Sequence, residues 1–314
     1  AWLNRGKESI ALDLKTDEDR DLLLRIVDQA DVFMQNLAVG ATMRLGLDAE
    51  TLMARNQRLV VCDLSGYGPS GPMAKMKAYD LLVQAESGIL SVSGPPGPYG
   101  RVGVSLVDLS TGMNAAIAIM QALYRQARTG GGAHLETSLF ASASELMAVP
   151  LIHHDYLGKG PERVGLAHPS ISPYGGFESA DGHTVVISVQ SDREWRVLCA
   201  DVLGRPELGT DSRFASNPDR VANRSETDGL VAAEFGRMNR SELVAKLEHA
   251  RIAFGSVNDV AGLSQHPQLR RIGTEHEAGQ ARLPAPPVAT DWDHEPAVPG
   301  LDQHGSQIRA EFGA

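Results

Sequence analysis

The junction between a short strand and a helix, at residues 129–141, is the most informative stretch for chemistry. A glycine turn leads into a predicted strand, and a new helix is expected to begin near Ser138. Carboxylates and hydroxyls are the side chains here that could act as nucleophiles in covalent catalysis. Glu136 lies on the strand and Ser138 and Ser142 flank the helix start, whereas Ala141 between the serines offers only a methyl group.

A second set of polar side chains lies on a loop bounded by prolines in the later half of the chain. His168, Ser170 and Ser172 lie between or beside Pro169 and Pro173, and Tyr174 and Gln190 follow on positions that flank strands. Such a loop could present hydroxyl and imidazole donors to an anion at a small entropic cost. A structural turn is an equally good interpretation, and both stay open.

Metal and disulfide chemistry are not expected. Cys62 and Cys199 are the only cysteines and do not form a C-x-x-C pair, which excludes a disulfide framework and a multi-thiolate zinc site. His153 and His154 have no third partner at ligand spacing.

Composition narrows the class of protein further. The 314 residues are enough for two domains. A formal charge of −10 argues against a nucleic-acid partner. No apolar run approaches the ~20 residues needed to cross a bilayer, and there is no signal peptide. We therefore predict a cytoplasmic protein with no membrane partner.

The chain begins without Met and enters a predicted strand at once, so we expect a fragment that lacks an N-terminal part.

Strands and helices alternate along the first half. Strands are predicted at residues 9–14, 32–34 and 59–64, with helices between them that are capped by Thr16 and Asp48. A long helix is predicted at 106–128. This order predicts an α/β fold with a doubly wound, Rossmann-like parallel sheet whose N-terminal part is missing. Ligands are expected on the loops at the carboxyl ends of the strands, such as residues 65–72.

In the second half of the chain, short strands alternate with helices. A strand at 184–189 is followed by helices at 193–203, 225–235 and 239–251. We predict a large domain at 1–150, a smaller α+β domain at 151–283, and a return segment to the large domain at 284–314.

The ordered set of motifs in this chain resembles family III CoA-transferases, the carnitine-CoA/formyl-CoA transferase group. The motifs are Asn4-Arg5-Gly6-Lys7, Gln35-Asn36, Met43-Arg44-Leu45-Gly46, Ser65-Gly66-Tyr67-Gly68, Lys77-Ala78-Tyr79-Asp80, Thr129-Gly130-x-Gly132 and Ser138-Leu139-Phe140. Three further stretches are similar to the subgroup that handles mesaconyl- or itaconyl-CoA: residues 168–175, 190–195 and 264–270.

This resemblance implies a reaction and identifies a departure from it. In the family an aspartate attacks the thioester and forms a mixed anhydride, then an aspartyl-CoA thioester that the acceptor acid opens. Ala141 occupies the position of that aspartate. Ala141 can be interpreted simply as a helix-favouring residue in a packed turn, or as the replacement of a nucleophile that was removed by engineering or lost naturally. We do not expect a neighbour to replace it: a serine ester would trap the acyl group, Glu136 should point to another face, and Asp108 is expected to cap the long helix.

The resemblance also assigns binding residues. It implies that CoA is held by Asn4, Arg5, Lys7, Asn36, Leu37, Arg44, Lys77 and Tyr79. Residues assigned to the substrate are Asp80, His168, Ser170 and Gln190, although Asp80 is more simply explained as the cap of the helix that follows it. The related racemases place a His before the Asp that opens the long helix. Val107 stands there, so racemisation is not expected.

Two functions remain open at this point. The first is transfer of CoA between carboxylic acids, through a nucleophile that is replaced here by Ala141. The alternative is a catalytically inactive protein that binds CoA or acyl-CoA on the same scaffold. Coenzyme A is the expected acyl carrier and no metal is expected. The partners expected are an acyl-CoA, a carboxylic acid and a second copy of the chain in an interlocked homodimer.

Overall fold

The computed structural model describes residues 2–276, 279–288, 290 and 297–313. Contacts divide the chain into two compact units, each of which is described by itself. The first unit comprises Ala1–Ser87, Val104–Leu146 and Ser264–Ala314, and the second comprises Gly88–Gly103 and Met147–Leu263. The domain boundaries at 150 and 283 stay predictions.

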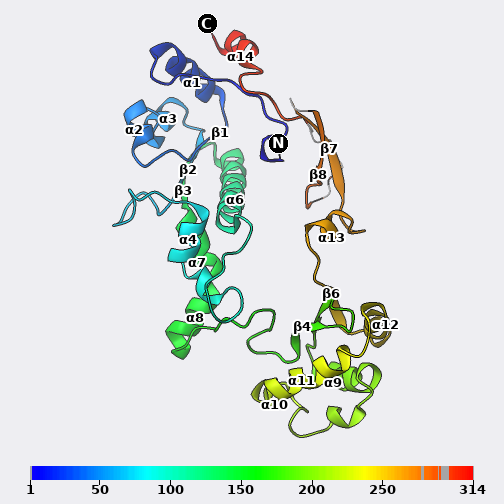
Figure 1. The fold of residues 1–314 in the computed structure, drawn as a ribbon. Coiled ribbons are helices and arrows are strands. Elements are labelled where there is room, and N and C mark those ends of the chain that lie inside the picture. Colours follow the sequence, from blue (N-terminus) through cyan, green and yellow to red (C-terminus); the bar gives the residue numbers. More distant parts are fainter. Residues whose placement is uncertain (1, 277–278, 289, 291–296, 314) are drawn as a thin grey trace. The chain divides into compact units, whose positions relative to one another are not determined.

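A three-stranded parallel sheet lies at the centre of the first unit (Figure 1). The strand order is β1 (Val32–Gln35), β2 (Val60–Ser65), β3 (Ala133–Ser138). Val60 lies opposite Val32 on one side and Ala133 on the other. The first half of β2 is apolar and buried, as expected for a central parallel strand covered on both faces.

Helices pack against this sheet. Helices α1 (Asp17–Gln29) and α3 (Ala49–Arg55) form a core with the sheet around Val27, Leu52 and Val61. Thr16 and Asp48 cap these helices as predicted, since their side-chain oxygens accept the N–H groups of Asp19 and Thr51. Helix α6 (Leu106–Thr129) packs on β2 and β3.

The other elements of the first unit are short. Helix α2 spans Ala41–Leu45, α4 spans Asp80–Glu86, α7 spans Leu139–Leu146 and α14 spans Gly305–Phe312. Strands β7 (Arg271–His276) and β8 (Gly279–Pro284) form an antiparallel pair. The first unit is thus mixed α/β with a parallel sheet. The doubly wound arrangement and a missing N-terminal part stay predictions.

The strand predicted at residues 9–14 is wrong: Trp2–Asn4 forms a 3-10 turn, and no strand follows it before β1. Residues 9–13 have no regular secondary structure, and Leu14 begins a turn. Ser9 N–H donates to His304 Nδ1 at 3.1 Å, and Ala11 N–H donates to Asp302 Oδ1 at 2.9 Å. The backbone donors are therefore satisfied by side chains near the chain end, a contact that local alternation does not encode. The return segment predicted at 284–314 begins at the last residue of β8, and its residues 289, 291–296 and 314 lie outside the described residues.

Among the described residues, helix α6 is long and apolar enough, by length and composition alone, to cross a membrane. The core helix of a globular protein passes the same test, and the absence of a membrane partner stays a prediction. Met113, Ile117 and Met120 are exposed along it within this chain.

The second unit is built on a three-stranded antiparallel sheet. Its strands are β4 (Tyr174–Glu178), β5 (Thr184–Ser188) and β6 (Ala253–Ser256). Trp195, Phe235 and Leu243 are fully buried in the core beside it. Its helices are α5 (Ile89–Val92), α8 (Ala148–Leu157), α9 (Asp192–Val197), α10 (Asn217–Ala222), α11 (Arg224–Phe235) and α12 (Arg240–Ala250), and α13 (Val260–Ser264) follows at the boundary. Helix α9 continues as a π-helical turn through Val202.

Candidate functional site

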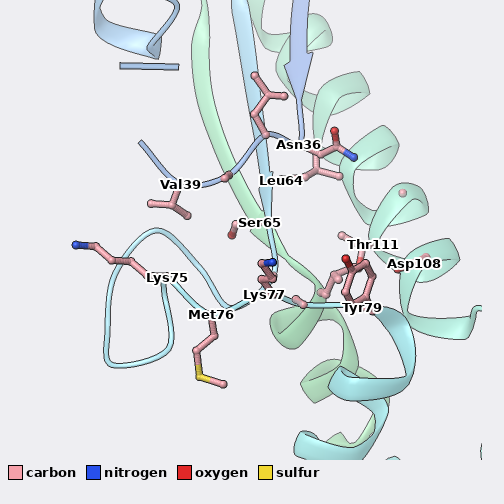
Figure 2. Close-up of a pocket in the computed structure, with 16 residues that line it drawn as sticks. Asn36, Val39, Leu64, Ser65, Lys75, Met76, Lys77, Tyr79, Asp108 and Thr111 are labelled. Carbon is pink, nitrogen blue, oxygen red and sulfur yellow. The ribbon is translucent and has the colours of Figure 1, made fainter. Parts of the chain in front are cut away.

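A cavity of about 580 Å³ opens at the carboxyl ends of β1 and β2, where open parallel sheets bind ligands. Its wall is made of the loop after β1, the end of β2, the loop before α4 and one side of α6 (Figure 2). The lining residues are Asn36, Leu37, Ala38, Val39, Leu64, Ser65, Gly66, Lys75, Met76, Lys77, Ala78, Tyr79, Asp108, Thr111, Gly112 and Leu139.

One glycine allows this wall to form, and a second, at the opposite end of the sheet, allows β3 to pair with β2. A Cβ on Gly66 would lie 2.3 Å from the Cβ of Ala78, so only glycine lets the end of β2 meet the loop before α4. A Cβ on Gly132 would lie 2.1 Å from the carbonyl oxygen of Leu59. Gly132 therefore permits β3 to start beside β2. This explains in physical terms why the turn before β3 needs glycine.

Four of the predicted CoA residues line the cavity: Asn36, Leu37, Lys77 and Tyr79. Lys75, which the sequence prediction missed, gives the lining a second ammonium group. Figure 2 shows Lys77 between the end of β2 and the residues of α6. Cations and an apolar wall in one cavity suit an anionic ligand with an apolar arm.

The other predicted CoA residues lie elsewhere in the first unit. Lys7 Nζ donates to Asn4 Oδ1 at 3.0 Å, and Lys7 lines a separate hollow together with residues near the chain end. Arg5 holds one buried guanidinium nitrogen without a hydrogen-bond partner among the described residues. Arg44 is exposed on α2 and is not among the residues that line the cavity. Their roles in CoA binding stay predictions.

Position 141 lies at the third residue of α7. Ala141 is exposed, and its N–H donates to Ser138 Oγ at 3.0 Å. Ser142 is buried, and its hydroxyl accepts from the Asn114 amide at 3.3 Å. Both hydroxyls thus serve the helix start and its packing. Glu136 lines a different cavity, beside α2 and α3, in agreement with the expectation that it points to another face.

Neither Asp80 nor Asp108 caps the helix that the sequence assigned to it. Asp80 was expected to cap its own helix, but its Oδ1 accepts the N–H groups of Val107 at 2.8 Å and Asp108 at 3.4 Å. It is therefore buried and caps α6 across 27 residues of sequence. Asp108, expected to cap α6, instead lines the cavity. The pKa of the Asp108 carboxyl is raised by desolvation and, to a lesser degree, by the charge of Asp80.

A hydrogen-bonded chain that the sequence prediction missed crosses the three parallel strands, from the last residue of β1 through the middle of β2 to the second residue of β3. Gln35 Nε2 donates to Asp63 Oδ1 at 2.7 Å, and Asp63 Oδ2 lies 2.8 Å from His134 Nε2. These side chains line the cavity that also contains Glu136, of about 460 Å³. Their parallel register could have indicated the cluster only once the strand order was known.

The proline-bounded loop in the second unit is held mainly through its backbone. Arg224 donates to the carbonyls of His168 at 2.9 Å and Ile171 at 3.1 Å, and Arg220 donates to that of Ser172 at 2.7 Å. His168 stacks on Tyr174, with ring centroids 5.2 Å apart.

The side chains of this region make local contacts. His168 Nδ1 accepts the Ser170 N–H at 3.2 Å, which leaves Nε2 as the proton-bearing nitrogen of a neutral ring. Gln190 donates from its amide to Ser188 Oγ. The anchored carbonyls are what a structural turn requires. Substrate contact by His168, Ser170 and Gln190 stays a prediction.

Both cysteines, Cys62 and Cys199, are free and buried. Burial raises the pKa of Cys199 to about 12, so its thiolate is scarce at neutral pH. Burial also raises the pKa of Cys62. Among the described residues, no group of three or more His, Cys, Asp or Glu side chains is arranged to hold a metal ion.

Known proteins of one family are similar to this chain over nearly its whole length. The sequence model described as CoA-transferase family III matches residues 1–304. The acetyl-CoA:oxalate CoA-transferase of Acetobacter aceti is 38% identical over 100% of this chain and 82% of its own length. A succinate–glutarate CoA-transferase of Agrobacterium fabrum is 34% identical, covering 98% of this chain and 79% of that protein.

One further relative bears on the mesaconyl subgroup, and one crystal structure bears on the fold. The succinyl-CoA:mesaconate CoA-transferase of Haloarcula hispanica is 30% identical, covering 99% of this chain and 81% of that protein. A CAIB/BAIF family protein from Brucella suis superposes with a TM-score of 0.84 at 36% identity, covering 98% of this chain and 82% of that one. The chain therefore belongs to CoA-transferase family III.

Proposed function

We propose that this protein binds CoA thioesters in the cavity beside α6 and serves the transfer of CoA between small dicarboxylic acids. The observation that carries the proposal is the convergence of Asn36, Leu37, Lys77 and Tyr79 on that cavity. These residues were assigned to CoA from their motifs alone. Their grouping at the carboxyl ends of the parallel strands gives the assignment a physical basis.

The chemistry of the lining suits an acyl-CoA. Lys75 and Lys77 supply positive charge for phosphate or carboxylate groups, and Leu37, Val39 and Met76 supply apolar surface for the pantetheine arm. This local positive charge matters because the chain as a whole has a formal charge of −10. An anionic ligand must therefore be drawn by nearby groups.

The proposed acids follow from what the relatives are named for. Oxalate, glutarate and mesaconate occur in the names of the relatives above, and each is a small dicarboxylate. We propose that class for this protein. The narrower mesaconyl or itaconyl preference rests on the motifs at residues 168–175 and 190–195 and on one relative at 30% identity.

A carboxylate at position 141 would complete the reaction. Its oxygen would attack the thioester carbonyl, forming a C–O bond, breaking the C–S bond and releasing CoA thiolate. The thiolate would then attack the carboxyl carbon of residue 141 and release the first acid. The second acid would reverse both steps. The start of α7 would help to keep such a carboxylate ionised.

A second candidate function follows from Ala141 itself. Ala141 has no nucleophilic atom, and the hydroxyls of Ser138 and Ser142 are already engaged. On these grounds the protein would hold an acyl-CoA without transferring it. The codon at this position in the source gene separates the two origins of Ala141: an aspartate codon supports engineering and an alanine codon supports natural loss.

The test combines binding with turnover. Calorimetric titration of CoA and succinyl-CoA into the protein should give saturable binding of both. Exchange of label between succinyl-CoA and free succinate should be near background with Ala141 and clearly present with Ala141→Asp. Lack of CoA binding would reject the proposal, and binding without exchange in both proteins would favour the second candidate.

We also propose that the protein forms a homodimer. Met113, Ile117 and Met120 follow one another at helical spacing on α6 and are exposed within this chain. Such a stripe is commonly covered in an assembly. Light scattering coupled to size-exclusion chromatography should give twice the mass of the chain, and a monomer at all concentrations would contradict this proposal.

A further inference from the structure

Asp108 is the carboxyl group in the lining of the cavity beside α6. It lies in the first turn of α6, and Thr111 and Gly112 follow on the same side one turn later. Figure 2 shows Asp108 and Thr111 together, next to Tyr79. Within the described residues, the Asp108 side chain makes no hydrogen bond or ion pair. Its oxygens are therefore available to a ligand in the cavity.

The N-terminus of α6 is already capped by another carboxylate, that of Asp80. Asp80 accepts the N–H groups of Val107 and Asp108, and its second oxygen accepts the Gln84 amide at 2.6 Å. The positive end of the helix dipole is thus partly neutralised before Asp108 is considered. A second negative charge next to Asp80 is unfavourable, which adds to the cost of desolvation and raises the pKa of Asp108.

The other charged groups around Asp108 are few. The loop before α4 contributes Lys75, Lys77 and the phenol of Tyr79 to the lining. The loop after β1, the end of β2 and α7 contribute uncharged residues. Asp80, on α4, caps the start of α6 and is not among the lining residues. The cavity therefore combines two cations with one carboxyl that holds a proton more readily than a free aspartate.

We propose that protonated Asp108 donates a hydrogen bond to the carboxylate of the acid that accepts CoA and so positions that acid in the cavity. A carboxyl–carboxylate hydrogen bond is charge-assisted and short-ranged. The ionised form of Asp108 would instead repel the acid. This inference rests on the proposed function, because it takes the cavity to be the acyl-CoA site. It adds a recognition group for the acceptor acid that lies apart from position 141.

The test is the pH dependence of acid binding to the CoA-saturated protein. Succinate is titrated calorimetrically between about pH 6 and about pH 8, where it is mostly a dianion. If only protonated Asp108 binds the acid, the apparent affinity should fall by up to about tenfold per pH unit. Asp108→Asn keeps an N–H donor but does not titrate, so its succinate affinity should stay flat across this range. Asp108→Glu should restore the slope.

Asp17→Asn is the matched control, because Asp17 is an exposed carboxylate on α1. It should keep the slope of the unmodified protein. CoA should bind saturably to all four proteins, and far-UV circular dichroism should confirm that each is folded. If CoA binds but Asp108→Asn shows the same pH slope for succinate as the unmodified protein, the inference is wrong and the proposed function stands. If CoA binds to none of them, the proposed function fails and the inference falls with it.

Discussion

Asp80 on α4 caps α6 through the N–H of Val107, at a distance of 2.8 Å. Both residues are buried, so this hydrogen bond fixes the start of the helix that carries Asp108 and Thr111 into the cavity. Buried donors left without an acceptor are costly. The geometry of the cavity therefore depends on a carboxylate that does not line it.

Removing this cap should destabilise the first unit. Asp80→Ala leaves the N–H groups of Val107 and Asp108 without their acceptor, which should lower the free energy of unfolding by about 1–3 kcal/mol. Urea denaturation followed by circular dichroism measures this change. Asp80→Asn retains an acceptor oxygen and should recover part of the loss. An unchanged midpoint in Asp80→Ala would show that the cap contributes little.

Ala141→Asp should create transfer activity. Loss of a covalent nucleophile costs several powers of ten in rate, so its return should raise exchange by a similar factor. A covalent CoA–protein species trapped with the acceptor absent and detected by mass spectrometry would mark the intermediate. Ala141→Asn, which matches the shape without the nucleophile, should stay inactive. Equal exchange by the Ala141 and Asp forms would contradict the assignment of this position.

Variants of Lys77 and Arg44 test whether CoA contacts the cavity, the surface of α2, or both. Lys77 lines the cavity, so Lys77→Met should weaken CoA binding by about 1.5–3 kcal/mol, the range for hydrogen bonds to charged groups. Lys15→Met changes an exposed lysine elsewhere in the unit and should have no effect. Arg44→Ala is predicted from its motif to weaken CoA by a similar amount. Calorimetry that finds unchanged affinity in either variant removes that residue from the site.

Arg220 should be essential for the stability of the second unit. Its guanidinium is fully buried and donates to the carbonyls of Ser172 and Phe214 and to Asp192 Oδ1, at 2.7–2.8 Å. Arg220→Met leaves these acceptors unpaired: water can reach Asp192, which is 45% exposed, but each buried carbonyl left without a donor costs about 1–3 kcal/mol. Thermal unfolding measures the loss.

The matched variant for Arg220 is Arg220→Lys. It keeps the charge but lacks the planar fork that reaches three acceptors, so it should recover little stability. Full recovery by lysine would show that charge alone matters there.

The loop of His168 gives two distinct expectations. If the loop contacts the substrate, His168→Ala should weaken binding of succinyl-CoA selectively and leave free CoA unaffected. If it is a structural turn, the change should act only on stability, since the loop carbonyls are held by Arg224 and Arg220. Parallel titrations with both ligands decide between these outcomes, and equal weakening of the two would exclude a contact with the acyl group.

Local sequence signals determined much of the scaffold. Thr16 and Asp48 predicted two helix starts, because the side chain of a capping residue accepts a hydrogen bond from an N–H only three residues away. The long helix was predicted to end within one residue of Thr129, where Gly130 adopts φ +78°. The ordered motifs identified the family, and the lining of the cavity by Asn36, Leu37, Lys77 and Tyr79 follows from their places at the ends of strands and in the loop before α4.

Only the tertiary structure decided which carboxyl caps α6 and which one lines the cavity. The sequence suggested that Asp80 and Asp108 each cap their own helix, but Asp80 caps α6 and Asp108 faces the cavity. Residues 9–14 alternate like a strand, yet their donors bond near the chain end, to His304 and Asp302. In each case the deciding hydrogen bond joins residues that are far apart in sequence. Propensity and periodicity report only what neighbours along the chain favour, and burial of a long-range partner can override them.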